Sequence, residues 1–248
     1  MNIIGIIPAR YGSTRFPGKM LTKISGKSLI QRVWERCSLA PLEGLYIATD
    51  HEAIQTHAEQ FGAQVIMTSI EHPSGTDRCF EALGKIGGKV DYVINIQGDE
   101  PYIDPMQIKA LAEILDGKTE LATLIKSAKK IDEVLDQASA KVVINKDQEA
   151  IYFSRSPIPF VRGQAVEQWL SHADFYIHVG LYAYRADILK AISHIPEGKL
   201  ELAEKLEQLR WLESGYRIKT VLTDGASLSV DRPEDVAKAE DFAAKWGL

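Results

Sequence analysis

Residues 3–19 read IIGIIPARYGSTRFPGK, an apolar run that passes directly into a loop carrying three basic side chains. An apolar run without alternation is typical of a strand buried on both faces of a parallel sheet. In open α/β sheets, ligands bind beyond the carboxyl ends of the strands. The stretch therefore predicts a parallel sheet whose first loop forms part of a ligand site.

The same kind of run recurs along the first half of the chain. Short apolar segments lie at Leu45–Ala48, Gln64–Met67 and Tyr92–Ile96. Within Leu29–Cys37 the apolar residues are spaced three and four apart, which places them on one face of a helix. Strands that alternate with helices indicate βαβ units. We expect an α/β fold with an open, mostly parallel nucleotide-binding sheet flanked by helices.

The pattern changes after about residue 120. Lys141–Asn145, Ala150–Phe153 and Tyr176–Tyr184 are β-rich, and helical periodicity returns in Leu200–Ser214 and Pro233–Trp246. These segments predict a smaller, mixed, β-rich insertion.

We expect one domain over residues 1–248, with a sub-domain at approximately 140–190. The formal net charge of -5 and the pI near 5.7 argue against a nucleic-acid or membrane-surface partner, because such proteins usually carry a basic surplus. The sequence has no run of roughly 20 apolar residues that would span a bilayer. Cys37 and Cys79 have no partners at zinc or redox spacing, so we expect buried thiols and a cytoplasmic protein.

The loop after the first apolar run is suited to binding phosphate. Gly12 and Gly18 permit tight turns, and Arg10, Arg15 and Lys19 supply three positive charges. Guanidinium and ammonium groups can neutralise a triphosphate as charge moves to the leaving pyrophosphate. The alternative is a solvated basic loop. The dinucleotide fingerprint and the P-loop pattern are both missing, which disfavours a dehydrogenase or a kinase.

Two aspartates are candidate magnesium ligands. Asp99 follows the apolar run Tyr92–Ile96, and Asp231 follows another short run far along the chain. Magnesium usually takes one or two carboxylates plus substrate phosphates. For Asp231 the alternative is the N-cap of the last helix, since aspartate commonly caps helices.

Seven blocks together resemble the 3-deoxy-manno-octulosonate (Kdo) cytidylyltransferases, also called CMP-Kdo synthetases. They occur in the family's order across nearly the whole chain: Pro8–Lys19, Ala48–His51, Ser74–Arg78, Asn95–Pro101, Tyr152–Arg155, His178–Arg185 and Leu206–Arg210. The resemblance implies a magnesium-dependent nucleotidyltransferase of lipopolysaccharide biosynthesis that moves the cytidylyl group of CTP onto Kdo, giving CMP-Kdo and pyrophosphate.

The resemblance also implies a role for individual residues. The nucleotide-binding set would be Arg10, Ser13, Arg15, Lys19, Ser74, Gly75, Arg78 and Gln97. The catalytic set would be Arg10, Lys19 and Asp99, and the metal ligands would be Asp99 and Asp231. The sugar-binding set would be Arg78, Arg155, His178, Tyr182, Glu207 and Gln208, with Arg78 or Arg155 meeting the sugar carboxylate. The family is also expected to form homodimers through the mixed sub-domain.

The sugar-side assignments have structural alternatives. His178 would serve equally as a structural histidine, and either Tyr182 or Tyr184 should pack in the core because the two alternate on a strand. An exposed helical face would explain Glu207 and Gln208. Rival functions are the same chemistry on another sugar acid (8-amino-Kdo or a sialic-acid-like acceptor), a non-catalytic nucleotide-sugar binding protein, and a metal-dependent glycosyltransferase. The basic first loop disfavours the last, which expels no pyrophosphate.

Overall fold

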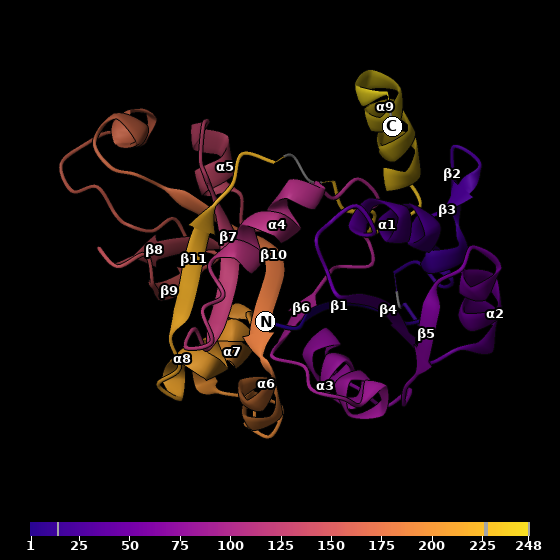
Figure 1. Ribbon diagram of the computed structural model, residues 1–248. Helices are drawn as coiled ribbons and strands as arrows, with labels where there is room; N and C mark the ends of the chain where they lie inside the picture. Colours follow the sequence, from indigo (N-terminus) through magenta and orange to yellow (C-terminus); the bar gives the residue numbers. More distant parts are fainter. Residues whose placement is uncertain (14, 226–227, 248) are drawn as a thin grey trace. The chain divides into compact units, whose positions relative to one another are not determined.

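The computed structural model describes residues 1–13, 15–225 and 228–247 (Figure 1). The chain forms two compact units. One comprises Met1–Ala112 with Gly225–Leu248, and the other comprises Glu113–Asp224. The second unit extends on both sides beyond the sub-domain expected at residues 140–190. Each unit is described by itself below.

The first unit is built on four parallel strands. They are β1 (Ile3–Ala9), β4 (Gly44–Thr49), β5 (Gln64–Met67) and β6 (Tyr92–Asn95), in the spatial order β6-β1-β4-β5. All four coincide with predicted strands to within two residues at each end. Ile6, Ile7, Ile47 and Ile94 are fully buried, which is why these runs do not alternate. The prediction of a mostly parallel sheet flanked by helices is confirmed.

Helices cover both faces of these strands. Figure 1 shows α1 (Leu29–Cys37) on one side of β1 and α3 (Gly75–Ile86) on the other. The remaining elements of this unit are α2 (Glu52–Gln60), α4 (Pro105–Glu113), α9 (Asp235–Trp246), the 3-10 helix η1 (Lys19–Leu21) and the hairpin of β2 (Lys23–Ile24) and β3 (Lys27–Ser28). Cys37 and Cys79 are buried in α1 and α3, as predicted.

The strand order reverses between β1 and β6. From β1 the chain moves outward to β4 and β5, and α3 then returns it to β6 on the other side of β1. A reversal of this kind opens a crevice at the carboxyl ends of the two strands, and ligands of open α/β sheets bind there. The loop after β1 and Asp99 after β6 both lie at this place.

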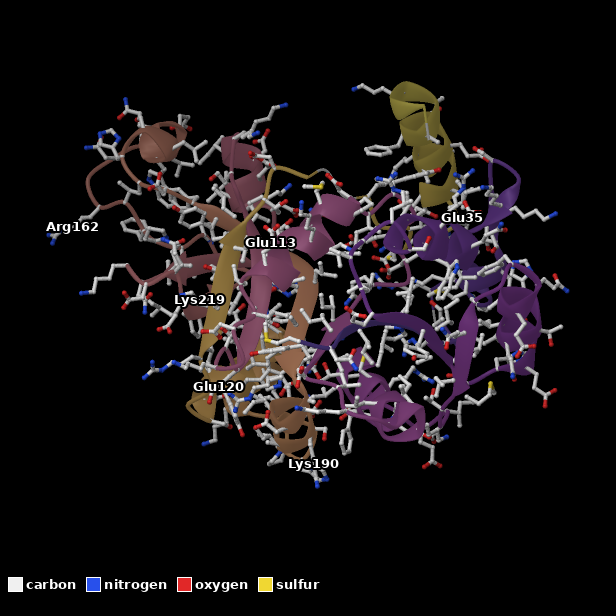
Figure 2. The ribbon with its side chains drawn as sticks, viewed as in Figure 1. Glu35, Glu113, Glu120, Arg162, Lys190 and Lys219 are labelled. Atoms are coloured by element: carbon white, nitrogen blue, oxygen red, sulfur yellow. The ribbon has the colours of Figure 1, made fainter. Side chains whose placement is uncertain are left out.

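The second unit has a mixed sheet. Its strands are β7 (Leu121–Ser127), β8 (Lys141–Ile144), β9 (Ala150–Ser154), β10 (Tyr176–Arg185) and β11 (Ile218–Leu222). Strand β7 pairs antiparallel with β10 and parallel with β11, and β8 pairs antiparallel with β9 and β10. Figure 2 shows Glu120 at the start of β7 and Lys219 on the neighbouring β11. The sequence analysis did not predict β7 or β11.

The helices of the second unit are short. They are α5 (Ile131–Leu135), η2 (Val166–Ser171), α6 (Ala186–Ile192), α7 (Lys199–Glu204) and α8 (Gln208–Glu213). The continuous periodicity predicted over Leu200–Ser214 is divided, because Lys205 adopts a left-handed conformation with φ of 55°. The half-buried Arg210 guanidinium donates to both carboxylate oxygens of the buried Glu201, at 2.7 and 2.6 Å, and thereby joins α8 to α7. No helix in the described part of the chain is long and apolar enough to cross a bilayer.

Candidate functional site

Lys19 is the centre of the charged site in the first unit. Gly18 places it there, because a φ of 68° turns the chain into η1 and favours glycine. The buried Lys19 ammonium donates to Asp99 Oδ2 at 2.8 Å, to Asp231 Oδ1 at 3.4 Å and to the Val230 carbonyl at 3.3 Å. Two carboxylates distant in sequence therefore meet at one positive charge.

Backbone pairing brings the two carboxylates together. The Val230 N–H donates to the Asp99 carbonyl at 2.9 Å, which fastens the segment before α9 to the end of β6. Asp231 is not the N-cap of the last helix, because α9 begins at Asp235 after the N-cap Glu234. The capping alternative for Asp231 is therefore wrong. Its carboxylate instead pairs with Arg15 at 3.1 Å and with Lys19.

The sequence from Gln97 to Glu100 closes the β6 end of the site. A Cβ on Gly98 would lie 2.7 Å from the Pro8 carbonyl oxygen, so only glycine permits β1 and β6 to end this close together. Burial, with a smaller effect of the Asp99 charge, raises the pKa of Glu100 to about 7. At neutral pH, Glu100 consequently adds less than a full negative charge beside Asp99.

A cavity of about 270 Å³ opens at this cluster. Every nucleotide-binding and metal-binding residue predicted from the sequence lines this cavity. Its lining consists of Pro8, Arg10, Ser13, Arg15, Lys19, Met20, His72, Pro73, Ser74, Gly75, Arg78, Gln97, Gly98, Asp99 and Asp231. Residues from four separated parts of the first unit thus converge on one volume.

The first loop contributes two exposed arginines to the lining of this cavity. Arg10 is exposed and makes no ion pair with any residue that the structure describes, and Arg15 is exposed while paired with Asp231. Ser13 is buried, and its Oγ accepts the Phe16 N–H at 3.4 Å. Thr14, within the same motif, lies outside the described residues. The solvated-loop alternative does not describe Lys19, which is buried in ion pairs.

Helix α3 begins at the cavity wall. Ser74 is its N-cap, and the Ser74 Oγ accepts the Asp77 N–H at 3.1 Å. Ser74 and Gly75 line the cavity, so the amide groups of the first helical turn lie beside it. Helix N-termini favour negative ligands, which suits a bound nucleotide.

The Arg78 guanidinium is hydrogen-bonded to protein groups. Its buried guanidinium donates to Asp50 Oδ2 at 2.9 Å, to Thr68 Oγ1 at 2.6 Å and to the Ser69 carbonyl at 3.2 Å. Asp50 Oδ1 in turn accepts the Tyr11 N–H at 3.0 Å, which ties the first loop to α3. These contacts argue against Arg78 as the partner of a sugar carboxylate, although the residue does line the cavity.

Apart from Arg78, the predicted sugar-side residues lie in the second unit. A bulge in β10 between Val179 and Tyr182 breaks the strict alternation of side chains. Tyr182 and Tyr184 are consequently both buried, where the sequence alternation had predicted one of them in the core. The His178 Nε2 lies 2.9 Å from Thr123 Oγ1, and burial lowers the pKa of His178 to about 4. A histidine held neutral in this way can accept or donate one hydrogen bond without adding charge.

The buried polar groups without partners in this unit include two that belong to predicted sugar-side residues. The Gln208 Nε2 and the Tyr182 hydroxyl make no hydrogen bond to any described residue. Thr123 lies near Tyr182, but its hydroxyl is donated to the Leu181 carbonyl at 2.8 Å. Burying such groups without partners costs free energy, and binding sites are a common reason for it. Gln208 is buried in α8, so the exposed-face alternative is wrong for it; Glu207 directly precedes that helix.

The Arg155 guanidinium is hydrogen-bonded to backbone carbonyl groups. Its guanidinium donates to those of Gln137, Ala138, Glu204 and Lys205, at 2.8 to 3.4 Å. The assignment of Arg155 to a sugar carboxylate stays a prediction, since a ligand would have to share these donors.

Sequence reasoning gave no role to His72, which lines the cavity, or to Asp50 and Glu81, which contact its lining residues. Asp50 follows β4 as Asp99 follows β6, so the strand-end argument would have found it. His72 precedes the recognised Ser74–Arg78 block and lines the cavity. Its Nε2 is hydrogen-bonded to Glu81, a residue whose position in the middle of α3 carried no signal.

Comparison with known proteins shows the family of the chain. A family model described as Cytidylyltransferase matches residues 4–219, and the chain belongs to that family of nucleotidyltransferases. A 3-deoxy-manno-octulosonate cytidylyltransferase of Parabacteroides distasonis is 51% identical over 98% of this chain and 99% of its own length. The predicted resemblance to CMP-Kdo synthetases is thereby confirmed.

Two further relatives bear on the ligands. An 8-amino-3,8-dideoxy-manno-octulosonate cytidylyltransferase of Shewanella putrefaciens is 46% identical over 98% of this chain and 99% of its own. A solved structure of CMP:2-keto-3-deoxy-manno-octonic acid synthetase, complexed with CTP, has a TM-score of 0.92 and 39% identity. It covers 99% of this chain and 100% of its own.

Proposed function

We propose that the chain transfers the cytidylyl group of CTP to 3-deoxy-manno-octulosonate, giving CMP-Kdo and pyrophosphate for lipopolysaccharide biosynthesis. The anomeric 2-hydroxyl oxygen attacks the α-phosphorus, the bond from that phosphorus to the bridging oxygen breaks, and pyrophosphate leaves in line. The hydroxyl proton passes to solvent or to a nearby base. The observation that carries the proposal is the convergence of Lys19, Asp99 and Asp231 in a cavity at the strand reversal.

The basic residues of the first loop stabilise the charge that develops on the leaving group. Lys19 is buried and held at the cavity wall, so its positive charge is already in place beside the phosphates. Arg10 and Arg15 are exposed and can close on the outer phosphates. Positioning and charge stabilisation are the main sources of rate in phosphoryl transfer.

Asp99 and Asp231 fit a magnesium ion. Their carboxylates already converge on a positive charge, the Lys19 ammonium, and oxygen is the donor that magnesium prefers. The described residues contain no cluster of three or more such ligands, which suits an ion that takes its remaining oxygens from phosphates and water. When bound, magnesium would neutralise phosphate charge and orient the attacking oxygen.

The acceptor is proposed to bind through uncharged groups of the second unit. The unpartnered Tyr182 hydroxyl and Gln208 amide offer hydrogen bonds to sugar hydroxyls, with His178 and Glu207 nearby in sequence and structure. A relative that acts on the 8-amino sugar is almost as similar as those that act on Kdo. The 8-amino acceptor is therefore the second candidate.

A coupled pyrophosphate-release assay tests the function. The purified chain is supplied with CTP and magnesium, and the acceptor is Kdo, 8-amino-Kdo, a sialic acid or none. We expect release with Kdo and little without acceptor, and chelation of magnesium should abolish it. Binding of CTP with no release on any acceptor would instead support a non-catalytic nucleotide-sugar binding protein.

We also propose a cytoplasmic homodimer. The thiols of Cys37 and Cys79 are buried and form no disulfide with each other, which suits a reducing compartment. In the segment 140–190, Ile151 is 59% and Phe160 is 73% exposed, apolar area that a second copy would cover. Light scattering coupled to gel filtration should give twice the chain mass of 27.6 kDa, and replacing both residues with serine should reduce it to one.

A further inference from the structure

His72 is a polar residue of the nucleotide cavity for which the proposed reaction has no use. It precedes Pro73 and Ser74 on the wall where α3 begins, and its side chain is 20% exposed. Only one of its two ring nitrogens is occupied. Nε2 is hydrogen-bonded to Glu81, whereas Nδ1 has no partner among the described residues.

Glu81 determines which ring nitrogen carries the hydrogen. Its carboxylate accepts the Ser69 N–H at 2.8 Å and lies 2.7 Å from the Lys85 ammonium. Burial opposes ionisation, but hydrogen bonds from Lys85, Ser69 and His72 outweigh it and lower the pKa of Glu81 to about 2. An ionised carboxylate can only accept, so the hydrogen lies on Nε2. In neutral His72, Nδ1 is then a hydrogen-bond acceptor directed away from Glu81.

The chemistry of the cavity divides between two kinds of wall. The cations and carboxylates of the first loop and strand ends suit the triphosphate and a metal. The His72–Gly75 wall has no cationic side chain apart from His72 itself. A nucleotide whose phosphates lie against the cations leaves its base and ribose for this wall.

We propose that His72, oriented by Glu81, selects the base of the nucleotide. Nδ1 accepts a hydrogen bond from the exocyclic amino group of cytosine. Uracil has a carbonyl oxygen at that position, and two acceptors facing each other repel. This inference rests on the proposed cytidylyl transfer and adds a determinant of nucleotide choice to it.

The test compares CTP with UTP in titration calorimetry and in the pyrophosphate assay. His72→Phe keeps a planar ring but removes the acceptor, and we expect the affinity for CTP to fall about 10- to 100-fold while that for UTP is unchanged or rises. Glu81→Gln should shift the ratio in the same direction by less, because the tautomer is no longer imposed. The exposed His172 of the second unit provides a matched control, and His172→Phe should leave both affinities unchanged.

Long-range proton–nitrogen NMR measures the protonation of each His72 ring nitrogen. If His72 only stabilised the fold, these nitrogen shifts would not respond differently to CTP and UTP. The wild-type His72 ring should show the hydrogen on Nε2 and an unprotonated Nδ1 whose nitrogen shift changes when CTP, but not UTP, is added. The thermal unfolding of each variant is measured so that misfolded protein is excluded, and His72→Asn, whose Oδ1 can replace the acceptor, should recover part of the CTP preference.

The outcomes separate the two proposals. Equal losses for CTP and UTP in His72→Phe, or no loss for either, would overturn base selection while leaving cytidylyl transfer intact. Normal discrimination in binding, with no pyrophosphate release by the wild-type chain on any acceptor, would overturn the transfer reaction and leave base selection supported. A chain that binds neither nucleotide overturns both.

Discussion

The candidate nucleotide site of the first unit and the candidate sugar site of the second unit treat polar groups in opposite ways. In the first unit, Lys19 is buried with two carboxylates, so its charge has protein partners before any ligand arrives. In the second unit, the buried groups of Tyr182 and Gln208 are uncharged and have no partners. A buried charge without a partner is far more costly than a buried amide or hydroxyl. A charged site therefore has to be assembled with its counter-ions, whereas a neutral site can be left open.

The largest effect should come from breaking the charged cluster at Asp99. Asp99→Asn keeps the shape but removes a negative charge and a metal oxygen, so we expect turnover to fall about 10²- to 10⁴-fold with little change in the KM for the sugar acid. Steady-state pyrophosphate release over a range of magnesium concentrations measures this. Asp241→Asn, an exposed position in the same unit, carries the same charge change and should be neutral. Near-normal turnover at every magnesium level would remove Asp99 from the metal site.

The next effect should be on stability, through the buried pair of Arg78 and Asp50. Arg78→Met leaves the Asp50 carboxylate buried with only the Tyr11 N–H, and we expect the free energy of unfolding to fall by about 3–5 kcal/mol. Denaturant unfolding gives the value. The double variant Arg78→Met with Asp50→Leu, which removes both charges, should recover much of it. Unchanged stability in the single variant, with a large rise in the KM for the sugar acid, would restore Arg78 as a ligand of the sugar carboxylate.

The sequence predicted the first unit better than the second, for a physical reason. Strands β1, β4, β5 and β6 are buried on both faces, so their apolar runs stand out, and the residues that follow β1 and β6 must meet at one edge of the sheet. This reasoning placed Lys19 and Asp99 together. The position of Asp231 depends on a backbone contact between Val230 and Asp99, which no local pattern indicates. The short apolar run before Asp231 made it a candidate ligand with helix capping as the alternative, and the family resemblance favoured the ligand.

In the second unit, local patterns were overridden by tertiary structure. The helix predicted over Leu200–Ser214 is divided at Lys205, a residue with no turn preference, and the resulting α7 and α8 are joined by the pair of Glu201 and Arg210. The bulge in β10 placed both Tyr182 and Tyr184 in the interior, although strict alternation predicts opposite faces. Which groups lack partners is a property of the packed unit and is not encoded in any short stretch.

Because buried His178 is kept uncharged in the candidate sugar site, the stability of the protein should depend on pH. His178 has a pKa of about 4 when folded, below the unfolded value near 6.5, so the unfolded chain binds more protons between these values. The stabilising effect is complete above pH 6.5 and is lost as the pH falls. The free energy of unfolding should therefore drop by about 2 kcal/mol between pH 7 and pH 5 from this group.

Denaturant unfolding of wild type and His178→Gln at several pH values isolates that term. The variant has no imidazole to titrate. Its free energy of unfolding should therefore fall by about 2 kcal/mol less than that of the wild type between pH 7 and pH 5. Parallel curves for the two proteins would mean that water reaches the imidazole, and that the second unit is less closed to charge than its contacts indicate.

The smallest effect should come from the neutral site itself, at the Tyr182 hydroxyl. Tyr182→Phe removes a buried group that has no partner, so the free energy of unfolding should stay the same or rise. If that hydroxyl is kept for the acceptor, the KM for the sugar acid should rise about 5-fold while the KM for CTP is unchanged, since one uncharged hydrogen bond contributes roughly 1 kcal/mol. Tyr184→Phe, at a fully buried ring two residues away, is the matched control and should not alter the KM for the sugar acid. A variant that loses stability without any change in that KM would show that the hydroxyl stabilises the fold. The candidate sugar site would then not be a neutral site left open for a ligand, and its contrast with the paired charges around Lys19 would not hold.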